Sequence, residues 1–132
     1  DKIRDELTLQ FVERALYLIP LDPREQGYDV LGDTHINRDA AKVLADAAEA
    51  CWDAITVRDL NRFGASMRAG FEAQVAMFPR MMNEMLADMI EQYRHRALGW
   101  KVSGAGGGGY LILVADQPVD GGFQIVARRE LE

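Results

Sequence analysis

The amino-acid sequence predicts an α+β domain in which helices cover one face of an antiparallel sheet. Apolar residues recur at helical spacing through the middle of the chain, whereas both ends carry short apolar segments rich in β-branched and aromatic residues. The 132 residues suit a single domain, and 48% hydrophobic with 27% charged residues is an ordinary globular composition. We therefore expect one compact unit over residues 1–132.

Residues 7–21 are predicted to be extended, as one or two segments. Leu7, Leu9 and Phe11 alternate with polar residues, and residues 15–19 form a short apolar run typical of a buried strand. Pro20 and Pro23 end this segment. Residues 22–36 are rich in proline, glycine, aspartate and threonine and are predicted to be a long loop.

Three helices are predicted between residues 37 and 93. Asn37 is the expected N-cap of the first, whose apolar stripe runs from Ala40 to Ile55 and includes Val43, Cys51 and Trp52. Residues 56–59 have the spacing of a capping box before a second helix that carries a stripe over residues 60–75. Pro79 is expected in the first turn of a third helix, whose methionine-rich stripe spans residues 82–93.

The last third of the sequence changes to strand patterns. Residues 100–103 and 110–115 are predicted strands on either side of a glycine-rich run at 104–109, and residues 123–128 alternate as a closing strand.

Charge and composition exclude several functions. Fifteen basic and 21 acidic residues give a net charge of −6, which argues against nucleic acid as a partner. No apolar run approaches the roughly 18 residues of a membrane span, so we expect a cytoplasmic protein without membrane contact. The single Cys51 is predicted to be a core residue, and His35 and His95 are far apart in the sequence, so no metal site is predicted.

The glycine run matches two nucleotide-binding patterns only in part. Glycines at 104, 106 and 109 fit the dinucleotide fingerprint, but a strand follows where that fingerprint requires a helix. A phosphate loop of the Walker type would have Lys and Ser or Thr where this chain has Tyr110 and Leu111. A loose linker or a glycine-rich hairpin remains one interpretation; the other is a backbone that brings amide groups close to an anion or to another loop.

A second polar cluster precedes the first predicted helix and consists of Asp33, Thr34, Asn37 and Arg38. The favoured interpretation is a helix cap with an adjoining turn. The alternative is recognition of sugar hydroxyl groups, because carboxylates, amides and guanidinium groups suit their donors and acceptors.

The sequence KVSGAGGGGY at residues 101–110 resembles the third signature motif of the GHMP kinases, the family of galactokinase, homoserine kinase, mevalonate kinase and phosphomevalonate kinase. The pattern K-[VLI]-x-G-A-G-G-G-G-[FY], followed by an apolar strand, is specific. Its flanks at 97–100 and 111–116 are most similar to the branch that includes fucokinase and heptose-phosphate kinases. Residues 14–21 and 37–44 are similar to the C-terminal domain of that branch, more loosely.

This resemblance implies ATP-dependent phosphoryl transfer to a small-molecule hydroxyl, with Mg²⁺, by a parent sugar kinase. The chain would be its ferredoxin-like C-terminal domain, packed across the active-site cleft against an N-terminal ATP-binding domain. The residues expected to support the ATP phosphate loop and border the substrate are Ser103, Gly104, Ala105, Gly106, Gly107, Gly108 and Gly109. Asp33, Thr34, Asn37 and Arg38 are the expected substrate-side residues.

Departures from the family pattern limit what this chain is expected to do alone. Nothing matches the family's first motif or its P-x-x-x-G-L-G/S-S-S phosphate loop, and its catalytic Asp and Lys have no equivalent position. Only residues 117–122 separate the last two strands, where the family usually has a helix. We therefore expect a fragment with no catalytic residue and no tightly bound cofactor. The alternatives are a stand-alone ferredoxin-like binding or regulatory module and a domain that dimerises through its methionine-rich face.

Overall fold

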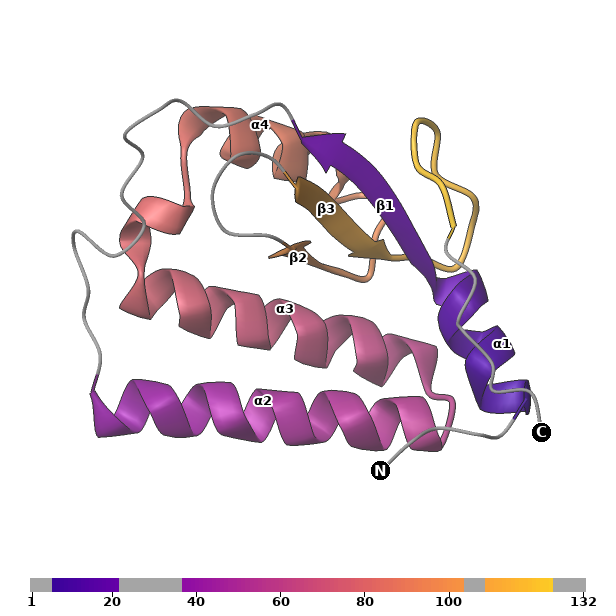
Figure 1. The fold of residues 1–132 in the computed structure, drawn as a ribbon, viewed down its shortest axis with the longest axis horizontal. Coiled ribbons are helices and arrows are strands. Elements are labelled where there is room, and N and C mark those ends of the chain that lie inside the picture. Colours follow the sequence, from indigo (N-terminus) through magenta and orange to yellow (C-terminus); the bar gives the residue numbers. More distant parts are fainter. Residues whose placement is uncertain (1–5, 22–36, 104–108, 125–132) are drawn as a thin grey trace.

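The computed structural model describes residues 6–21, 37–103 and 109–124. Four α-helices, one short 3₁₀ helix and three strands occur in these ranges (Figure 1). In chain order they are α1 (Glu6–Ala15), β1 (Leu16–Leu21), α2 (Arg38–Thr56), α3 (Leu60–Met77), η1 (Pro79–Met81), α4 (Glu84–Tyr93), β2 (Gly99–Ser103) and β3 (Gly109–Val114). The loop predicted at 22–36 lies outside the described residues.

The three strands form an antiparallel sheet, as the sequence predicted, and their order in it is β1-β3-β2. Ile112 at its centre pairs with Leu18 on one side and with Lys101 on the other. Phe123 bridges Leu18 through two backbone hydrogen bonds of 2.9 and 3.1 Å. Because these bonds occupy the edge of β1 that faces away from β3, the chain returns beside β1, as in a ferredoxin-like sheet. The rest of the predicted closing strand, residues 125–128, is outside the described residues.

Residues 7–15 form a helix, so the prediction of an extended segment there is wrong. Leu7, Phe11 and Ala15 recur every four residues and share one helical face. Phe11 packs on Phe63 of α3 with ring centroids 5.9 Å apart, and Ala15 is buried. The alternation of Leu7, Leu9 and Phe11 also fits a strand, but this packing favours the helical period.

Strand β1 continues through Pro20 to Leu21. The N–H of Leu18 donates to Phe123, and position 20 faces the same way, away from β3. The missing N–H of Pro20 therefore removes no hydrogen bond from the β1–β3 ladder.

The first helix of the middle region begins as predicted. The Asn37 side chain accepts a hydrogen bond of 2.8 Å from the backbone N–H of Ala40, which makes it the N-cap of α2. At residues 56–59 the structure has a helix cap at Asp59 but not the reciprocal hydrogen bonds of a capping box. Asp59 caps α3 by accepting from the N–H of Arg62 at 3.1 Å, whereas the Thr56 hydroxyl donates to the carbonyl of Asp53.

The third predicted helix is divided in two. Pro79 begins the 3₁₀ turn η1, and α4 starts only after Asn83, whose side chain accepts a 2.8 Å hydrogen bond from the N–H of Leu86. A proline fits the first turn of either helix type, so Pro79 alone does not identify which one it begins. Of the predicted methionine-rich stripe, Met82 before α4 and Met89 within α4 pack against the larger core.

Two apolar clusters hold the helices to the sheet. In the larger one, side chains of α3 and α4 pack on one face of the sheet; its fully or nearly buried members are Tyr17, Ile19, Phe71, Leu86, Ile90, Tyr93, Trp100, Val102, Leu111, Leu113, Ala115 and Val119. The smaller cluster surrounds Val114, whose side chain alternates to the other face, and joins Ala15, Ala54 and Phe63. Helix α3 thus passes along the β2 edge and contributes to both.

Helix α3 meets β2 at a pair of glycines. A Cβ atom on Gly99 would overlap the carbonyl oxygen of Gly64 and lie 2.6 Å from its carbonyl carbon. A Cβ atom on Gly64 would lie 2.5 Å from the Cβ of Leu98. Only glycine permits this approach of helix and strand backbones. Beside it, the Arg68 guanidinium lies 4.5 Å from the centre of the Trp100 ring, a cation–π contact.

Candidate functional site

The glycine run connects two neighbouring strands. Ser103 ends β2 opposite Tyr110, and Gly109 begins β3 opposite Leu21 at the end of β1. Gly109 has a φ of 137°, which strongly favours glycine, so the backbone leaves the run in a conformation that other residues rarely adopt. Residues 104–108 lie outside the described residues. Of the predicted cleft residues, the structure therefore places the two ends, Ser103 and Gly109.

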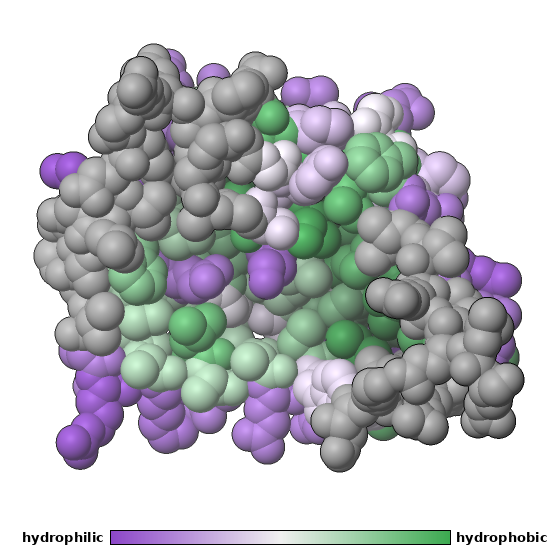
Figure 2. All heavy atoms as spheres, in the orientation of Figure 1, coloured by the Kyte–Doolittle hydropathy of each residue, from purple (hydrophilic) through white to green (hydrophobic). Residues whose placement is uncertain are grey.

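An exposed aromatic pair lies next to these ends. Tyr110 and Phe123 meet edge to face with ring centroids 5.8 Å apart, and they are 39% and 47% exposed. Tyr110 shares a sheet face with Ser103 and Ile112, opposite the face that packs on α4. Figure 2 shows apolar residues gathered over the middle of one side of the molecule. Exposed apolar side chains of this kind suit contact with another protein surface or a ligand.

A groove lies between α2, α3 and β2, with a volume of about 290 Å³. We call it the α2–α3 groove; its lining consists of Leu44, Ala47, Ala48, Cys51, Trp52, Ile55, Ser66, Met67, Gly70, Phe71, Gln74 and Lys101. Burial raises the pKa of the Cys51 thiol, and a hydrogen bond with Ser66 and the nearby Lys101 charge oppose that rise. The thiol is therefore protonated and neutral at physiological pH.

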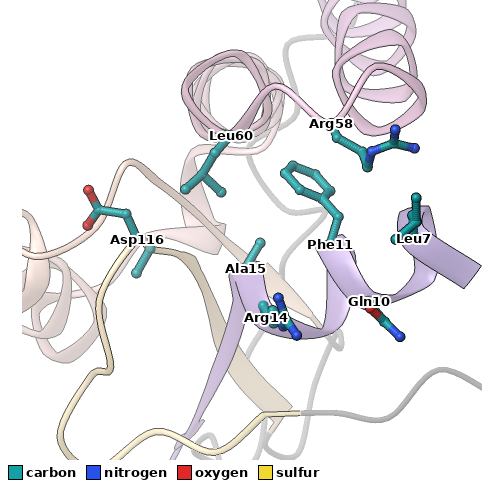
Figure 3. Close-up of a pocket in the computed structure, with 9 residues that line it drawn as sticks. Leu7, Gln10, Phe11, Arg14, Ala15, Arg58, Leu60 and Asp116 are labelled. Carbon is teal, nitrogen blue, oxygen red and sulfur yellow. The ribbon is translucent and has the colours of Figure 1, made fainter.

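A second cavity of about 310 Å³ lies between α1 and the turn that joins α2 to α3 (Figure 3). Phe11 and Leu60 give it apolar walls, and Arg14 and Arg58 stand at its sides. The Arg58 guanidinium donates to the Thr8 hydroxyl at 3.2 Å, and Arg58 has a φ of 56°. Arg58 thus anchors the turn to α1, which is a structural role.

The second predicted cluster is described only in part. Asp33 and Thr34 lie outside the described residues; Asn37 and Arg38 are exposed at the start of α2. Figure 1 shows α2 on the far side of α3 from the sheet, so these two residues lie away from the strand ends that flank the glycine run. The Asn37 side chain acts as a helix cap, and the substrate-side role of this cluster remains a prediction.

Sequence reasoning missed the α2–α3 groove. Cys51 was expected in the core but is only half-buried at the groove, and the neighbouring Trp52 is 42% exposed. Val43, from the same predicted stripe, is 53% exposed. One feature of the sequence could have predicted the groove. The apolar stripe of α2 is wider than a single partner helix can cover, and a tryptophan lies at its margin.

Among the described residues, no group of three or more His, Cys, Asp or Glu side chains is placed to hold a metal ion. Within the same ranges, no helix combines the length and the apolar character that crossing a membrane requires.

The family model for the C-terminal region of the GHMP kinases matches residues 40–125. The matched segment covers more than half of the chain and includes α2 from its third residue, all of α3, the glycine run and the aromatic pair. No curated protein matches the chain. The extent of the family match, on a fold of the expected α+β architecture, shows that this chain belongs to the GHMP kinase family and corresponds to its C-terminal domain.

Proposed function

We propose that this chain is the C-terminal domain of an ATP-dependent sugar kinase and contributes residues 103–109 to the active-site cleft. The family match carries this proposal, because GHMP kinases in general use ATP and the match includes the glycine run. The strand register supports it, since Ser103 and Gly109 stand at the ends of adjacent strands, beside the end of β1.

Phosphoryl transfer depends on positioning and on electrostatic stabilisation more than on covalent chemistry of the protein. A run of glycines without side chains lets backbone N–H groups approach a neighbouring phosphate loop or the substrate. The positive φ of Gly109 is consistent with a tight backbone path at one end of this run. In the proposal, residues 103–109 fix the position of the phosphate loop. The substrate-side role predicted for Asp33, Thr34, Asn37 and Arg38 is left out of it, because the start of α2 lies away from the strand ends that flank the glycine run (Figure 1).

A sugar substrate is proposed from the similarity of residues 97–100 and 111–116 to the sugar-kinase branch. The exposed Tyr110 and Phe123 rings beside the run offer flat apolar surfaces, and the exposed Ser103 hydroxyl offers a donor and acceptor. This combination suits a ligand that has both apolar C–H groups and hydroxyls.

The described residues do not form a magnesium site, because no cluster of three carboxylate or other ligating side chains is present in them. The proposal accordingly assigns no Mg²⁺ ligand to the described residues. In the proposal, the N-terminal domain of the parent kinase holds the metal and makes most of the contacts to ATP. Any contact of this chain with ATP is assigned to residues 104–108.

The partner that follows from the family is an N-terminal kinase domain. We propose that it packs on the sheet face that carries Tyr110, Ile112 and Ser103. A half-buried Ile112 beside two exposed aromatic rings is a surface that a second domain stabilises by covering it.

The test is a coupled ADP-release assay with a panel of free and phosphorylated sugars. The complete polypeptide that carries this chain should show sugar-dependent ADP release, and the 132-residue chain alone should show none. Supplying the N-terminal domain to this chain in trans should restore part of the activity. ADP release that does not depend on any sugar of the panel contradicts the sugar assignment. A complete protein that binds ATP and sugars without turnover supports instead a binding or regulatory module.

A further inference from the structure

The α2–α3 groove has a lining that suits a ligand of its own. We propose that it binds a small carboxylate with an apolar, preferably aromatic, body, and that the Lys101 ammonium holds the carboxylate. This proposal concerns the groove alone and does not depend on the kinase reaction.

The size of the groove favours a small molecule over a protein segment. Its volume of about 290 Å³ is just below the roughly 300–1,000 Å³ of typical ligand pockets. Leu44 and Trp52 of α2 face Met67 and Phe71 of α3 across it. The flat Trp52 ring, 42% exposed, gives an aromatic ligand a surface to stack on.

Among the described residues of the lining, Lys101 is the only one with a charged side chain. It is partly buried, and none of the residues that the structure describes forms an ion pair with it. The neighbouring Cys51 thiol is neutral because burial raises its pKa, so the groove carries one positive charge. An anion on the ligand complements this charge, whereas a neutral ligand leaves it without a partner.

The remaining polar groups of the lining are compatible with a carboxylate. The Ser66 hydroxyl donates within its own helix, to the carbonyls of Arg62 and Phe63. The side-chain amide of Gln74 brings two N–H donors to the same lining. A carboxylate has two acceptor oxygens, so one can pair with Lys101 while the other accepts from Gln74.

The probe for the test is 3-phenylpropionate, with the neutral 3-phenylpropanamide as its matched control. Both are titrated into the ¹⁵N-labelled chain and followed by amide chemical shifts and by the indole N–H signal of Trp52. We expect saturable shifts at Ala48, Gly70 and Lys101, and about tenfold weaker binding of the neutral probe. Shifts centred on Tyr110 and Phe123, or no saturable shifts, would overturn the proposal.

Two variants separate the charge of Lys101 from general apolar binding. Lys101→Gln should lower the affinity for the acid about tenfold and make the two probes equal. Lys42→Gln should leave both affinities unchanged, because Lys42 is exposed on α2 and pairs with Asp46 at 2.8 Å. The comparison of acid and amide on the unaltered chain needs no variant. It therefore tests the role of the Lys101 charge even if Lys101→Gln does not fold. Equal affinity of the two probes there refutes the role of Lys101.

Discussion

Replacing Gly99 by alanine should strongly destabilise the domain, since its Cβ would overlap the carbonyl oxygen of Gly64 and lie 2.6 and 2.8 Å from the carbonyl carbon and Cα. These are backbone atoms, which cannot move aside as the end of a flexible side chain can. Restoring an ordinary contact of 3.4 Å or more to the carbonyl oxygen requires α3 and β2 to separate by well over an ångström. That separation also loosens the packing of Phe63 and Trp100.

Overpacking typically costs about 1–3 kcal/mol, and a clash between two backbones belongs at or above the top of that range. For a domain of this length, each kcal/mol lowers Tm by about 3–5 °C. Gly99→Ala should therefore lower Tm by about 10–15 °C in a thermal melt followed by circular dichroism. Gly64→Ala should also lower Tm, because its Cβ would lie 2.5 Å from the Cβ of Leu98.

Gly70→Ala is the matched control within the same helix. Its Cβ would lie 3.6 Å from the Cβ of Ala47 and 3.9 Å from Cδ1 of Leu44, which are ordinary contacts. Alanine is favoured over glycine in a helix interior by about 0.8–1 kcal/mol, so Tm should rise by about 2–5 °C. A Gly99→Ala variant that melts within about 2 °C of the unaltered chain, or a Gly70→Ala variant that loses as much as Gly99→Ala, would refute the close approach of α3 and β2.

Asn37→Ala should lower the free energy of unfolding, measured in urea, by about 1 kcal/mol, because α2 loses its N-cap. A loss of sugar affinity with unchanged stability would instead support the substrate-side role of Asn37. Cys51 has a raised pKa in the folded domain, so the unfolded chain loses its thiol proton first and stability should fall as pH rises above about 9.0. The fall should be smaller for Cys51→Ala in urea unfolding from pH 7.5 to 10. Parallel profiles of the two proteins would contradict a raised pKa of the half-buried thiol. Gly107→Val in the complete kinase should lower sugar-dependent ADP release about a hundredfold with little change in Tm; near-normal turnover would show that the run is only a connection.

The fold class and the helices of the middle region could be predicted because local signals suffice for them. Asn37 caps its helix through an N–H only three residues away, and the stripes of α2 and α3 follow a single period. Residues 7–15 could not be assigned in this way. Leu7, Leu9 and Phe11 suit a strand, and Leu7, Phe11 and Ala15 suit a helix; the contact with Phe63, 52 positions away, decides between them.

The candidate site also has one part that the sequence predicts and one part that it does not. The glycine run is contiguous in the sequence and was recognised there, and the structure places its two ends on adjacent strands. The α2–α3 groove combines Cys51 and Trp52 with Lys101 from β2. No local pattern relates residues some 50 positions apart, so only the packing of α3 against β2 reveals that they share a surface.

The central position of β3 has a consequence for how the protein is made. Leu18 pairs with Ile112, about 94 positions later in the chain. At a translation rate of roughly 5–20 residues per second, β1 leaves the ribosome about 5–19 s before its partner exists. The hairpin of α2 and α3, whose contacts are local, is complete well before then and forms first. A nascent chain paused before residue 109 should accordingly hold a protected helical pair and a β1 segment open to chaperones and proteases.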